Sequence, residues 1–384
     1  MNPLDPSAKG LTRRAWMVLA GSTLSACGGG GGLLAALPGT GGTGSPLFAQ
    51  GSISGFGSVI INGIKFDDTQ AQVQVDGQTV TSADLRLGMV AEVQGERGAD
   101  LTLGSASSIA VWSIAQGMVS QSGSSSFVVS GMTVQTGTST VFEGVSSVGQ
   151  LVARQRVAVW GLQTGTDGTH WSATRVAVQA ADTQVVSSGM VRVADGVRLL
   201  NGYVLTGSQA VALSAGTLVR VQGVLAADGG SLEVNSVKAL GVLPAGQMQG
   251  EVEIEAYVTA ITSASRFTMG SFEVDASSAY YQPLNAKISV GARVEVYGSW
   301  TNGVLKATKV ELEDEQTLDQ AEIKGSITSF TSVADFVVRG QRCDASAATF
   351  SHGKAVDLKL GAYVKVSGTK AGDVLKVTSV EFHD

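Results

Sequence analysis

The stretch Gly291–Leu312 reads GARVEVYGSWTNGVLKATKVEL, and it defines the unit from which the chain is built. In its first half Val294 and Val296 alternate with polar residues, which is the period-two pattern of a half-buried β-strand. Asn302-Gly303 follows and favours a two-residue type I′ turn, because both residues accept a positive φ. The stretch is therefore predicted to be a β-hairpin.

The second half of this hairpin changes phase. Leu305 and Ala307 occupy one phase of the alternation, whereas Val310 and Leu312 occupy the other. One extra residue between the two pairs places both on the same face, and a β-bulge is the usual way to insert it. Bulges bend strands and increase their twist, as the closure of a small barrel requires.

The same hairpin recurs along the chain, and Gly361–Phe382 matches it at 11 of 22 positions without a gap. Each copy has a marker glycine that ends the first arm and follows a valine two residues earlier. An earlier hairpin precedes each copy, so about five strands occupy about 60–70 residues, a size at which a small barrel can fold. The marker glycines are Gly95, Gly161, Gly223, Gly298 and Gly368.

Five such copies predict an all-β chain of tandem five-stranded barrels, and a long connection between the third and fourth strands favours an OB-like topology. The composition agrees, with 50 Gly, 6 Pro and 15% charged residues and with no apolar stripe at helical spacing. We expect the barrels to close individually and to be joined by short linkers as separate beads. The predicted units are 51–116, 117–181, 182–249, 250–318 and 319–384. The third is compressed, and its sequence leaves open whether it is a complete barrel.

The first unit resembles a known family. Gly51–Asp67 (GSISGFGSVIINGIKFD), Asp76-Gly77, Asp84-Leu85 and Leu87–Gly95 (LGMVAEVQG) resemble the domain of unknown function 5666. That family is a bacterial module found in tandem in exported lipoproteins. The agreement is best in the first unit, lower in the fourth and fifth, and lowest in the second and third. Because the activity of the family is undefined, the resemblance implies an architecture and no catalytic residues.

Residues 1–26 are predicted to be a signal peptide. Thr12–Met17 (TRRAWM) resembles a twin-arginine export motif, and Leu24–Cys27 (LSAC) looks like a bacterial lipobox. In such lipoproteins the cysteine, here Cys27, becomes the first residue of the mature chain and carries lipid, including palmitate. The alternative is an ordinary secretory signal with a chance cysteine. Residues 27–50 are rich in Gly and are predicted to form a flexible tether.

The predicted location is the outer membrane, with the chain lipid-anchored and facing the periplasm or the cell surface. Gly28 supports it, because many inner-membrane lipoproteins carry Asp at this place. Cleavage before Cys27 removes three basic residues and one acidic residue, which leaves 23 basic and 31 acidic residues, a net charge of −8. This acidity and the 6% aromatic content argue against nucleic acid as a partner. Cys343 then has no cysteine with which to form an internal disulfide.

No pattern in the sequence is typical of an enzyme. An active site needs a convergent set of titratable groups, and the three histidines lie singly in the sequence, without HxxxH spacing or a Cys–His pair. GxSxG, Walker and Rossmann patterns are absent as well. We therefore predict a protein that is not an enzyme and uses no cofactor.

Four aromatic residues are the candidate ligand-stacking residues. The residue before each marker glycine is expected to point away from the valine core. This residue is Trp160 in the second copy and Tyr297 in the fourth. Trp171 and Trp300 lie near them in sequence, and the four are suited to stack on sugars or on a partner protein. The alternative is that they cover barrel ends or pack between neighbouring units.

Three carboxylates alternate at the start of the fourth unit. Glu251, Glu253 and Glu255 are expected on one face of a strand, where they are weak candidates for binding a divalent cation. The chain has no DxDxDG-type loop, so the alternative is a solvated strand edge that resists aggregation.

These observations predict a non-enzymatic, lipid-anchored protein of the bacterial cell envelope that acts as an interaction scaffold of tandem OB-like repeats. Its expected partners are the membrane, through the lipid on Cys27, and an envelope protein or glycan. The alternative function is an envelope binding protein for a glycan, a small ligand or a divalent metal.

Overall fold

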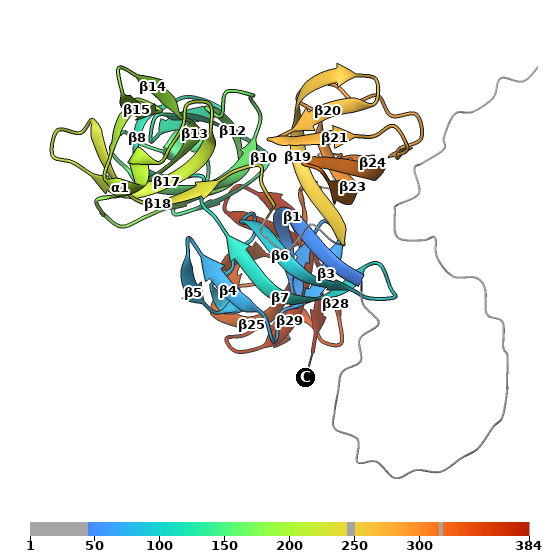
Figure 1. Cartoon of the computed structure of the whole chain (residues 1–384). Helices are drawn as coiled ribbons and strands as arrows, with labels where there is room; N and C mark the ends of the chain where they lie inside the picture. Colours follow the sequence, from blue (N-terminus) through green and yellow to red (C-terminus); the bar gives the residue numbers. More distant parts are fainter. Residues whose placement is uncertain (1–44, 244–249, 315–317, 384) are drawn as a thin grey trace, which may run out of the picture. The chain divides into compact units, whose positions relative to one another are not determined.

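The computed structural model describes residues 45–243, 250–314 and 318–383 (Figure 1). Within these ranges the regular structure is almost entirely β-strand, arranged as small closed barrels in tandem. The predicted fold class is therefore confirmed. Cys27 and the rest of the predicted signal peptide lie outside the described residues.

Unit 5 shows the strand order of the barrel. Its first strand, β25 (Gln320–Ser332), pairs antiparallel with β26 (Asp335–Val338) and with β29 (Tyr363–Ala371). β26 pairs with β27 (Gln341–Asp344), and β29 pairs with β30 (Val374–Phe382). The circle closes because β27 and β30 pair in parallel. This order is that of the OB-like barrel that the sequence predicted.

The other barrels repeat this order. Unit 1 contains β1 (Ser45–Phe56), β2 (Val59–Ile61), β3 (Ile64–Asp67), β4 (Gln72–Val75), β5 (Gln78–Val80), β6 (Val90–Arg97) and β7 (Leu103–Val111). Unit 2 contains β8 (Ala115–Ser122), β9 (Ser126–Val129), β10 (Met132–Glu143), β11 (Arg156–Gln163) and β12 (His170–Val178). Unit 4 contains β19 (Glu251–Ser263), β20 (Arg266–Met269), β21 (Phe272–Asp275), β22 (Tyr280–Gln282), β23 (Arg293–Thr301) and β24 (Val304–Leu312). Unit 5 adds β28 (Thr349–Ser351), and single 3₁₀ turns stand at η1 (Ser82–Asp84), η2 (Val148–Gln150) and η3 (Ala355–Asp357).

Unit 3 is a complete barrel although its sequence is compressed. Its strand β16 pairs in parallel with its last strand, β18, as β27 pairs with β30 in unit 5. The shortening falls between β16 and β17, where one helical turn stands in place of the longer connection of unit 5. The elements are β13 (Gln184–Met190), β14 (Arg192–Ala194), β15 (Val197–Leu200), β16 (Tyr203–Thr206), α1 (Ser208–Val211), β17 (Leu218–Leu225) and β18 (Ser231–Ala239).

The hairpin at Gly291–Leu312 has the predicted turn and bulge. Asn302 and Gly303 have φ angles of 51° and 81°, as a type I′ turn requires. Tyr297 pairs with Lys309 and Gly298 pairs with Ala307, so Thr308 is the extra residue of a β-bulge. The same shift occurs in all five units, where the extra residues are Ser107, Thr174, Asn235, Thr308 and Thr378.

The bulge explains the marker glycines. A Cβ atom on Gly298 would lie 2.1 Å from the carbonyl oxygen of Lys306 on the partner strand. The distance is again 2.1 Å between Gly368 and Lys376, and it is 1.9 Å between Gly95 and Ser105. Any side chain at these positions would push the two strands of the hairpin apart. The best-conserved feature among the five copies is therefore required by the backbone of the barrel itself.

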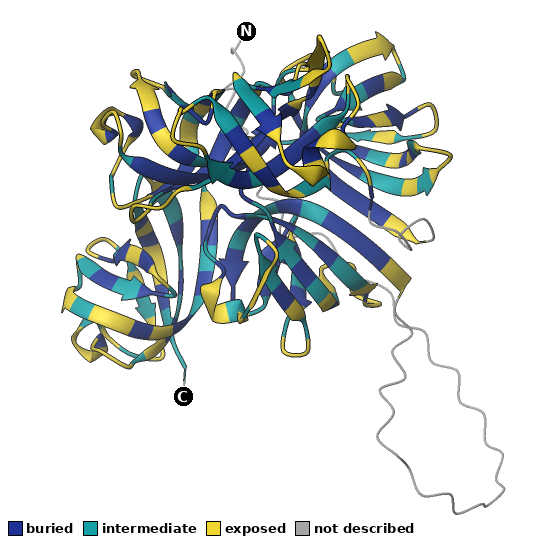
Figure 2. Cartoon of the chain, turned by 60° about the vertical axis from the view of Figure 1, so that its left-hand side comes forward, coloured by how far each residue is buried: buried dark blue, intermediate teal, exposed yellow. Residues whose placement is uncertain are grey.

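The barrel interiors are filled by one face of each strand. In unit 4 Val294, Val296 and Leu305 are 0% exposed and belong to the core of that barrel. Units 2 and 3 have cores of their own. Figure 2 shows the alternation of buried and exposed residues as bands along the strands.

The first strand joins several barrels. Leu47–Gln50 of β1 pair in parallel with β19 of unit 4, and Gly55-Phe56 pair in parallel with β25 of unit 5. The tether was expected to extend to Gln50, but Ser45–Gln50 belong to β1, because Leu47 and Phe48 are buried in two different cores. Units 1 and 5 also share one cluster of buried apolar side chains. The barrels close individually, as predicted, but they are not separate beads.

Candidate interaction faces of units 2 and 4

The hairpin of the fourth and fifth strands carries outward residues that differ between copies. In unit 2 its cross-strand pairs are Ala158 with Ala177 and Trp160 with Arg175. The same positions in unit 4 hold Glu295 with Glu311 and Tyr297 with Lys309. These side chains lie on the opposite side of the strand from the valines of their own barrel core. We call Val141, Ala158, Trp160 and Ala177 the unit 2 face, and Glu253, Glu255, Arg293, Glu295, Tyr297, Lys309 and Glu311 the unit 4 face.

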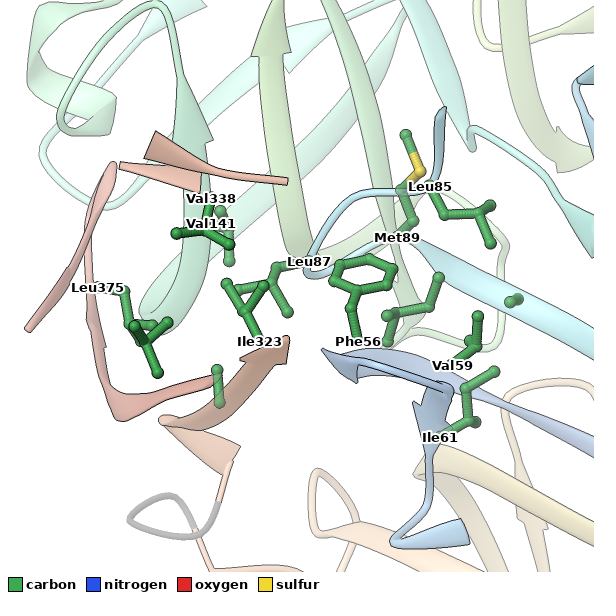
Figure 3. Close-up of a cluster of buried hydrophobic side chains, with 14 of the residues drawn as sticks. Phe56, Val59, Ile61, Leu85, Leu87, Met89, Val141, Ile323, Val338 and Leu375 are labelled. Atoms are coloured by element: carbon green, nitrogen blue, oxygen red, sulfur yellow. The ribbon is translucent and has the colours of Figure 1, made fainter. Parts of the chain in front are cut away.

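The unit 2 face is apolar and is buried among residues of units 1 and 5. Its four side chains are 1–4% exposed and belong to the cluster of units 1 and 5, not to the core of unit 2. The segment of unit 1 that packs there is Leu85–Met89, which we call the docking loop. Figure 3 shows Leu87 of this loop among Phe56, Val141 and Ile323.

The docking loop is held against β12 through the loop's own backbone. Arg175 Nη1 donates a hydrogen bond to the carbonyl oxygen of Leu87 at 3.1 Å, and the same guanidinium forms an ion pair with Glu143. Gly88 has a φ of 77°, and a Cβ atom there would lie 2.4 Å from the carbonyl oxygen of Thr174. The loop thus needs glycine both for its conformation and for its close approach to the strand.

The four predicted stacking residues lie in separate surroundings. Trp160 packs between units, which is the alternative that the sequence left open, and its 4% exposure leaves no ring face for a ligand. Trp171 is 5% exposed in the core of unit 2, where its Nε1 donates to the carbonyl oxygen of Gly168 at 2.8 Å. Trp300 packs edge-on against Phe272, with ring centroids 5.9 Å apart. The structure does not bring the four residues together into one platform.

The unit 4 face is charged and is also buried. Glu253, Glu255, Glu295 and Glu311 are 0–6% exposed, so this strand face is not a solvated edge. Arg97 of unit 1 forms an ion pair with Glu253. The carboxylate of Glu255 accepts hydrogen bonds from Arg293 Nε at 2.7 Å and from the backbone N–H of Ser52 in unit 1 at 2.8 Å.

Tyr297 lies between two cations at the centre of this face. Lys309 Nζ is 4.4 Å from the ring centroid, and the guanidinium carbon of Arg97 is 5.8 Å from it. Both distances are in the range of cation–π attraction. The ring of this predicted stacking residue is therefore already stacked by side chains of the protein.

The burial of these carboxyl groups changes their affinity for protons. Burial raises the pKa of Glu253, although Arg97 opposes the rise. Burial, together with the charge of Glu253, raises the pKa of Glu295 well above its ordinary value. Burial and the same two carboxylates also raise the pKa of Tyr297.

The three alternating glutamates do not form a metal site. Glu253 and Glu255 are each engaged by an arginine, and Glu251 Oε2 lies 3.6 Å from Arg97 Nε. In the part of the chain that the structure describes, no group of three or more His, Cys, Asp or Glu side chains is placed to hold a metal ion. The face serves the junction between units 1 and 4.

The histidines are placed differently from one another. His170 Nδ1 lies 3.3 Å from Asp167 Oδ1 within one turn of unit 2. His352 Nδ1 lies 3.7 Å and His383 Nε2 lies 3.8 Å from Glu381 Oε1. The parallel pairing of β28 with β30 brings Ser351, and with it His352, beside Glu381, whereas His383 is two residues from Glu381 in the sequence. Lys365 Nζ forms an ion pair with the same carboxylate at 2.5 Å.

The docking loop, Arg97 and Arg175 are the elements of these faces that the sequence alone did not identify. A signal for the loop was available, because Leu87 precedes Gly88 as Leu360 precedes Gly361. In both units this glycine lies seven residues before the marker glycine. No comparable pattern marks Arg97 or Arg175, whose partners lie in other units or strands.

Comparison with protein families defines the class of this protein. Residues 116–177, 255–311 and 324–381 match the model of the Domain of unknown function (DUF5666). The chain thus contains three repeated modules of this family. The matched segments lie in units 2, 4 and 5, so unit 2 carries the family pattern more clearly than its sequence suggested. The first unit, on which the resemblance was based, is not among them.

Comparison with individual proteins adds little. A solved structure titled "drosophila Unr CSD456" is similar over 45% of this chain and 79% of that chain, with 10% sequence identity and a TM-score of 0.15. A TM-score of this size is too low to relate the two arrangements. No curated protein matches the chain.

Proposed function

We propose that this protein is a non-enzymatic interaction scaffold of the bacterial cell envelope, anchored by a lipid on Cys27, whose tandem OB-like barrels bind a partner protein. One observation supports this proposal most directly. The docking loop of unit 1 packs against unit 2, and the equivalent loop of unit 5 is exposed.

The two loops correspond residue by residue. Leu87 of the docking loop and Leu360 of unit 5 each precede the glycine that opens the fourth strand of the barrel. Leu87 is 1% exposed, whereas Leu360 is 67% exposed. Val356, five residues before Gly361, is 85% exposed and stands where unit 1 has Ala83. Two large apolar side chains on one short loop are unfavourable in water and are typical of an interaction site.

The docking inside the molecule indicates what the partner looks like. The unit 1 loop lies on an apolar strand face that includes Trp160, and Arg175 beside that face binds the carbonyl oxygen of Leu87. We therefore expect the unit 5 loop to bind an envelope protein that offers an apolar strand face with a hydrogen-bond donor at its rim.

The anchor is proposed from the sequence. Thr12–Met17 and Leu24–Cys27 supply the export motif and the lipobox, and they lie outside the described residues. Among the residues that the structure describes, no helix is long and apolar enough to cross a membrane. Replacement of Cys27 by Ala is expected to move the protein from the membrane fraction to the soluble fraction. Retention of the variant in the membrane fraction would contradict the anchor.

Photo-crosslinking in cells tests the scaffold. A photoreactive residue at Leu360 is expected to give one adduct of defined mass, and Val356→Asp in the same chain is expected to abolish it. Leu101, in the β6–β7 turn of unit 1, is 59% exposed and is the matched control position. No adduct at Leu360, or the same adducts at both positions, would contradict the proposed function.

A further inference from the structure

A cavity of about 350 Å³ lies between units 2 and 3. Turns of unit 2 that contain Gly131 and Asp167 form one wall, and Met190, Arg192 and Leu199 of unit 3 form the other. Pockets that bind small molecules have volumes of about 300–1,000 Å³ and often lie between domains. The volume of this cavity therefore admits a small ligand.

Close backbone contacts fix the two walls relative to each other. A Cβ atom on Gly131 would lie 1.9 Å from the carbonyl oxygen of Asn201 in unit 3. A Cβ atom on Gly168 would lie 3.1 Å from the backbone nitrogen of Met190. Asn201 Nδ2 in turn donates a hydrogen bond to the carbonyl oxygen of Ser188 at 2.8 Å. The turns of unit 2 thus rest directly on unit 3, and the cavity beside them is formed without a ligand.

Arg192 brings an unpaired positive charge to this cavity. It is exposed on the hairpin of β14 and β15, where Leu199 is its cross-strand neighbour. Among the residues that the structure describes, its guanidinium group takes part in no ion pair and no hydrogen bond. The group therefore keeps all its donors for a ligand, and its planar fork matches the two oxygens of a carboxylate.

Asp167 brings a negative charge to the opposite wall. Its Oδ1 accepts a hydrogen bond from the backbone N–H of Thr169 at 3.0 Å and lies 3.3 Å from His170 Nδ1. Its Oδ2 accepts the hydroxyl hydrogen of Thr169 at 2.7 Å. A carboxylate can accept about four hydrogen bonds, so Oδ2 can accept one more from a ligand. The side chain is held in place by these bonds and is 49% exposed, which leaves it accessible.

Opposite charges on the two walls select the kind of ligand. A ligand with a single charge would be attracted by one wall and repelled by the other, whereas a zwitterion satisfies both. Met190 and Leu199 add apolar surface, and the flexible thioether of Met190 adapts to side chains of different shape. We propose that this cavity binds a free α-amino acid with an aliphatic side chain, with its carboxylate on Arg192 and its ammonium group on Asp167.

This site does not depend on the scaffold function, because the cavity and the unit 5 loop have no residue in common. Val356→Asp, which is expected to abolish the crosslink at Leu360, is accordingly expected to leave amino-acid binding unchanged. The two proposals can therefore fail separately.

Three related probes test the proposal by calorimetric titration of the full chain. L-leucine carries both charged groups, 4-methylpentanoate lacks its ammonium group, and 3-methylbutylamine lacks its carboxylate. We expect saturable binding of L-leucine at one site and binding of each of the other two that is weaker by about tenfold or more, since each loses one charge-assisted hydrogen bond. No saturable binding of L-leucine would overturn the proposal. So would equal affinity for L-leucine and 4-methylpentanoate, which would indicate a site for anions alone.

Two variants with matched controls locate the site. Arg192→Met is expected to weaken L-leucine binding by about tenfold and to remove the difference between L-leucine and 3-methylbutylamine. Arg198→Met is its control, because Arg198 pairs with Val193 and so lies on the opposite face of the same hairpin.

Asp167→Asn is expected to weaken L-leucine binding and to remove the difference between L-leucine and 4-methylpentanoate. Asp228→Asn is its control, since Asp228 accepts similar hydrogen bonds from Ser231 in the equivalent turn of unit 3, outside the cavity. A variant that only loosened the turn would weaken all three probes alike. Unchanged L-leucine binding in both Arg192→Met and Asp167→Asn, or equal losses in the variants and their controls, would refute the site.

Discussion

The faces of units 2 and 4 occupy the same place in the repeat and have opposite chemistry. Where unit 2 pairs Ala158 with Ala177, unit 4 pairs Glu295 with Glu311. Both faces are nevertheless buried against unit 1. The barrel therefore supplies the geometry of a junction, and the outward residues determine what holds it together.

The two kinds of junction differ in how they depend on the surroundings. Burial of apolar area on the unit 2 face stabilises by roughly 25 cal/mol per Å² and is insensitive to pH. Burial of the carboxylates on the unit 4 face costs desolvation energy that only well-placed cations repay. We expect the unit 2 junction to be permanent and the unit 4 junction to respond to protons.

The largest effect is expected when a charge is placed on the apolar face. Ala158→Glu puts a carboxylate at a position that is 2% exposed, while the arginine of this face, Arg175, is already paired with Glu143, and it should lower the free energy of unfolding by more than about 4 kcal/mol. Denaturant unfolding measures this loss. Ala83→Glu, at an exposed position of η1 in unit 1, is the control and should change little. A loss below about 1 kcal/mol for Ala158→Glu would mean that the face is not buried in solution.

The next effect is expected when a cation is removed from the charged face. Arg97→Met leaves Glu253, which is 0% exposed, without its arginine and should cost about 3 kcal/mol at neutral pH. Arg266→Met is the matched control, because the Arg266 side chain is 58% exposed in its ion pair with Asp275. Equal effects of the two variants would show that burial does not distinguish the two ion pairs.

The third effect is a pH dependence. The pKa of Glu295 is higher in the folded chain than in the unfolded chain, so the folded state holds this proton more tightly. The tighter proton binding of Glu295 therefore stabilises the fold most at a pH below the pKa that Glu295 has in the unfolded chain. This stabilisation is lost as the pH rises through the higher pKa that Glu295 has in the folded chain. Glu295→Gln removes the titration and should stabilise the chain by about 1 kcal/mol at pH 8 and not at all near pH 4. A difference between the two stability curves that does not vary with pH would contradict this account.

The local features of the fold were predictable because neighbouring residues determine them. The phase change between Ala307 and Val310 predicted the bulge, and Asn302-Gly303 predicted the turn. Even the marker glycines, recognised only as a repeating pattern, have a local cause in the carbonyl group that each one faces.

The use of the outer faces was not predictable in the same way. Glu253 and Arg97 are separated by 156 positions in the sequence, so nothing near Glu251–Glu255 indicates that this strand face is buried. Leu47 and Phe48 were assigned to a tether for the same reason, since the cores that bury them come from distant parts of the chain. An outward residue is recognisable from alternation alone, but its environment depends on how the units pack together.

The smallest effect is expected in unit 5, where the same two positions hold Lys365 and Glu381. Their ion pair is 2.5 Å long, but the side chains are 32% and 28% exposed, so water competes with it. Lys365→Ala should leave the free energy of unfolding indistinguishable from that of the unchanged chain. It should nevertheless be visible by NMR, because the hydrogen bond from Lys365 lowers the pKa of Glu381, and the variant should return that pKa toward its ordinary value. If Lys365→Ala destabilised the chain as much as Arg97→Met, burial would not be what separates these faces. The same position is Ala158 in unit 2, the buried Glu295 in unit 4 and the partly exposed Lys365 in unit 5, and this difference would then need another explanation.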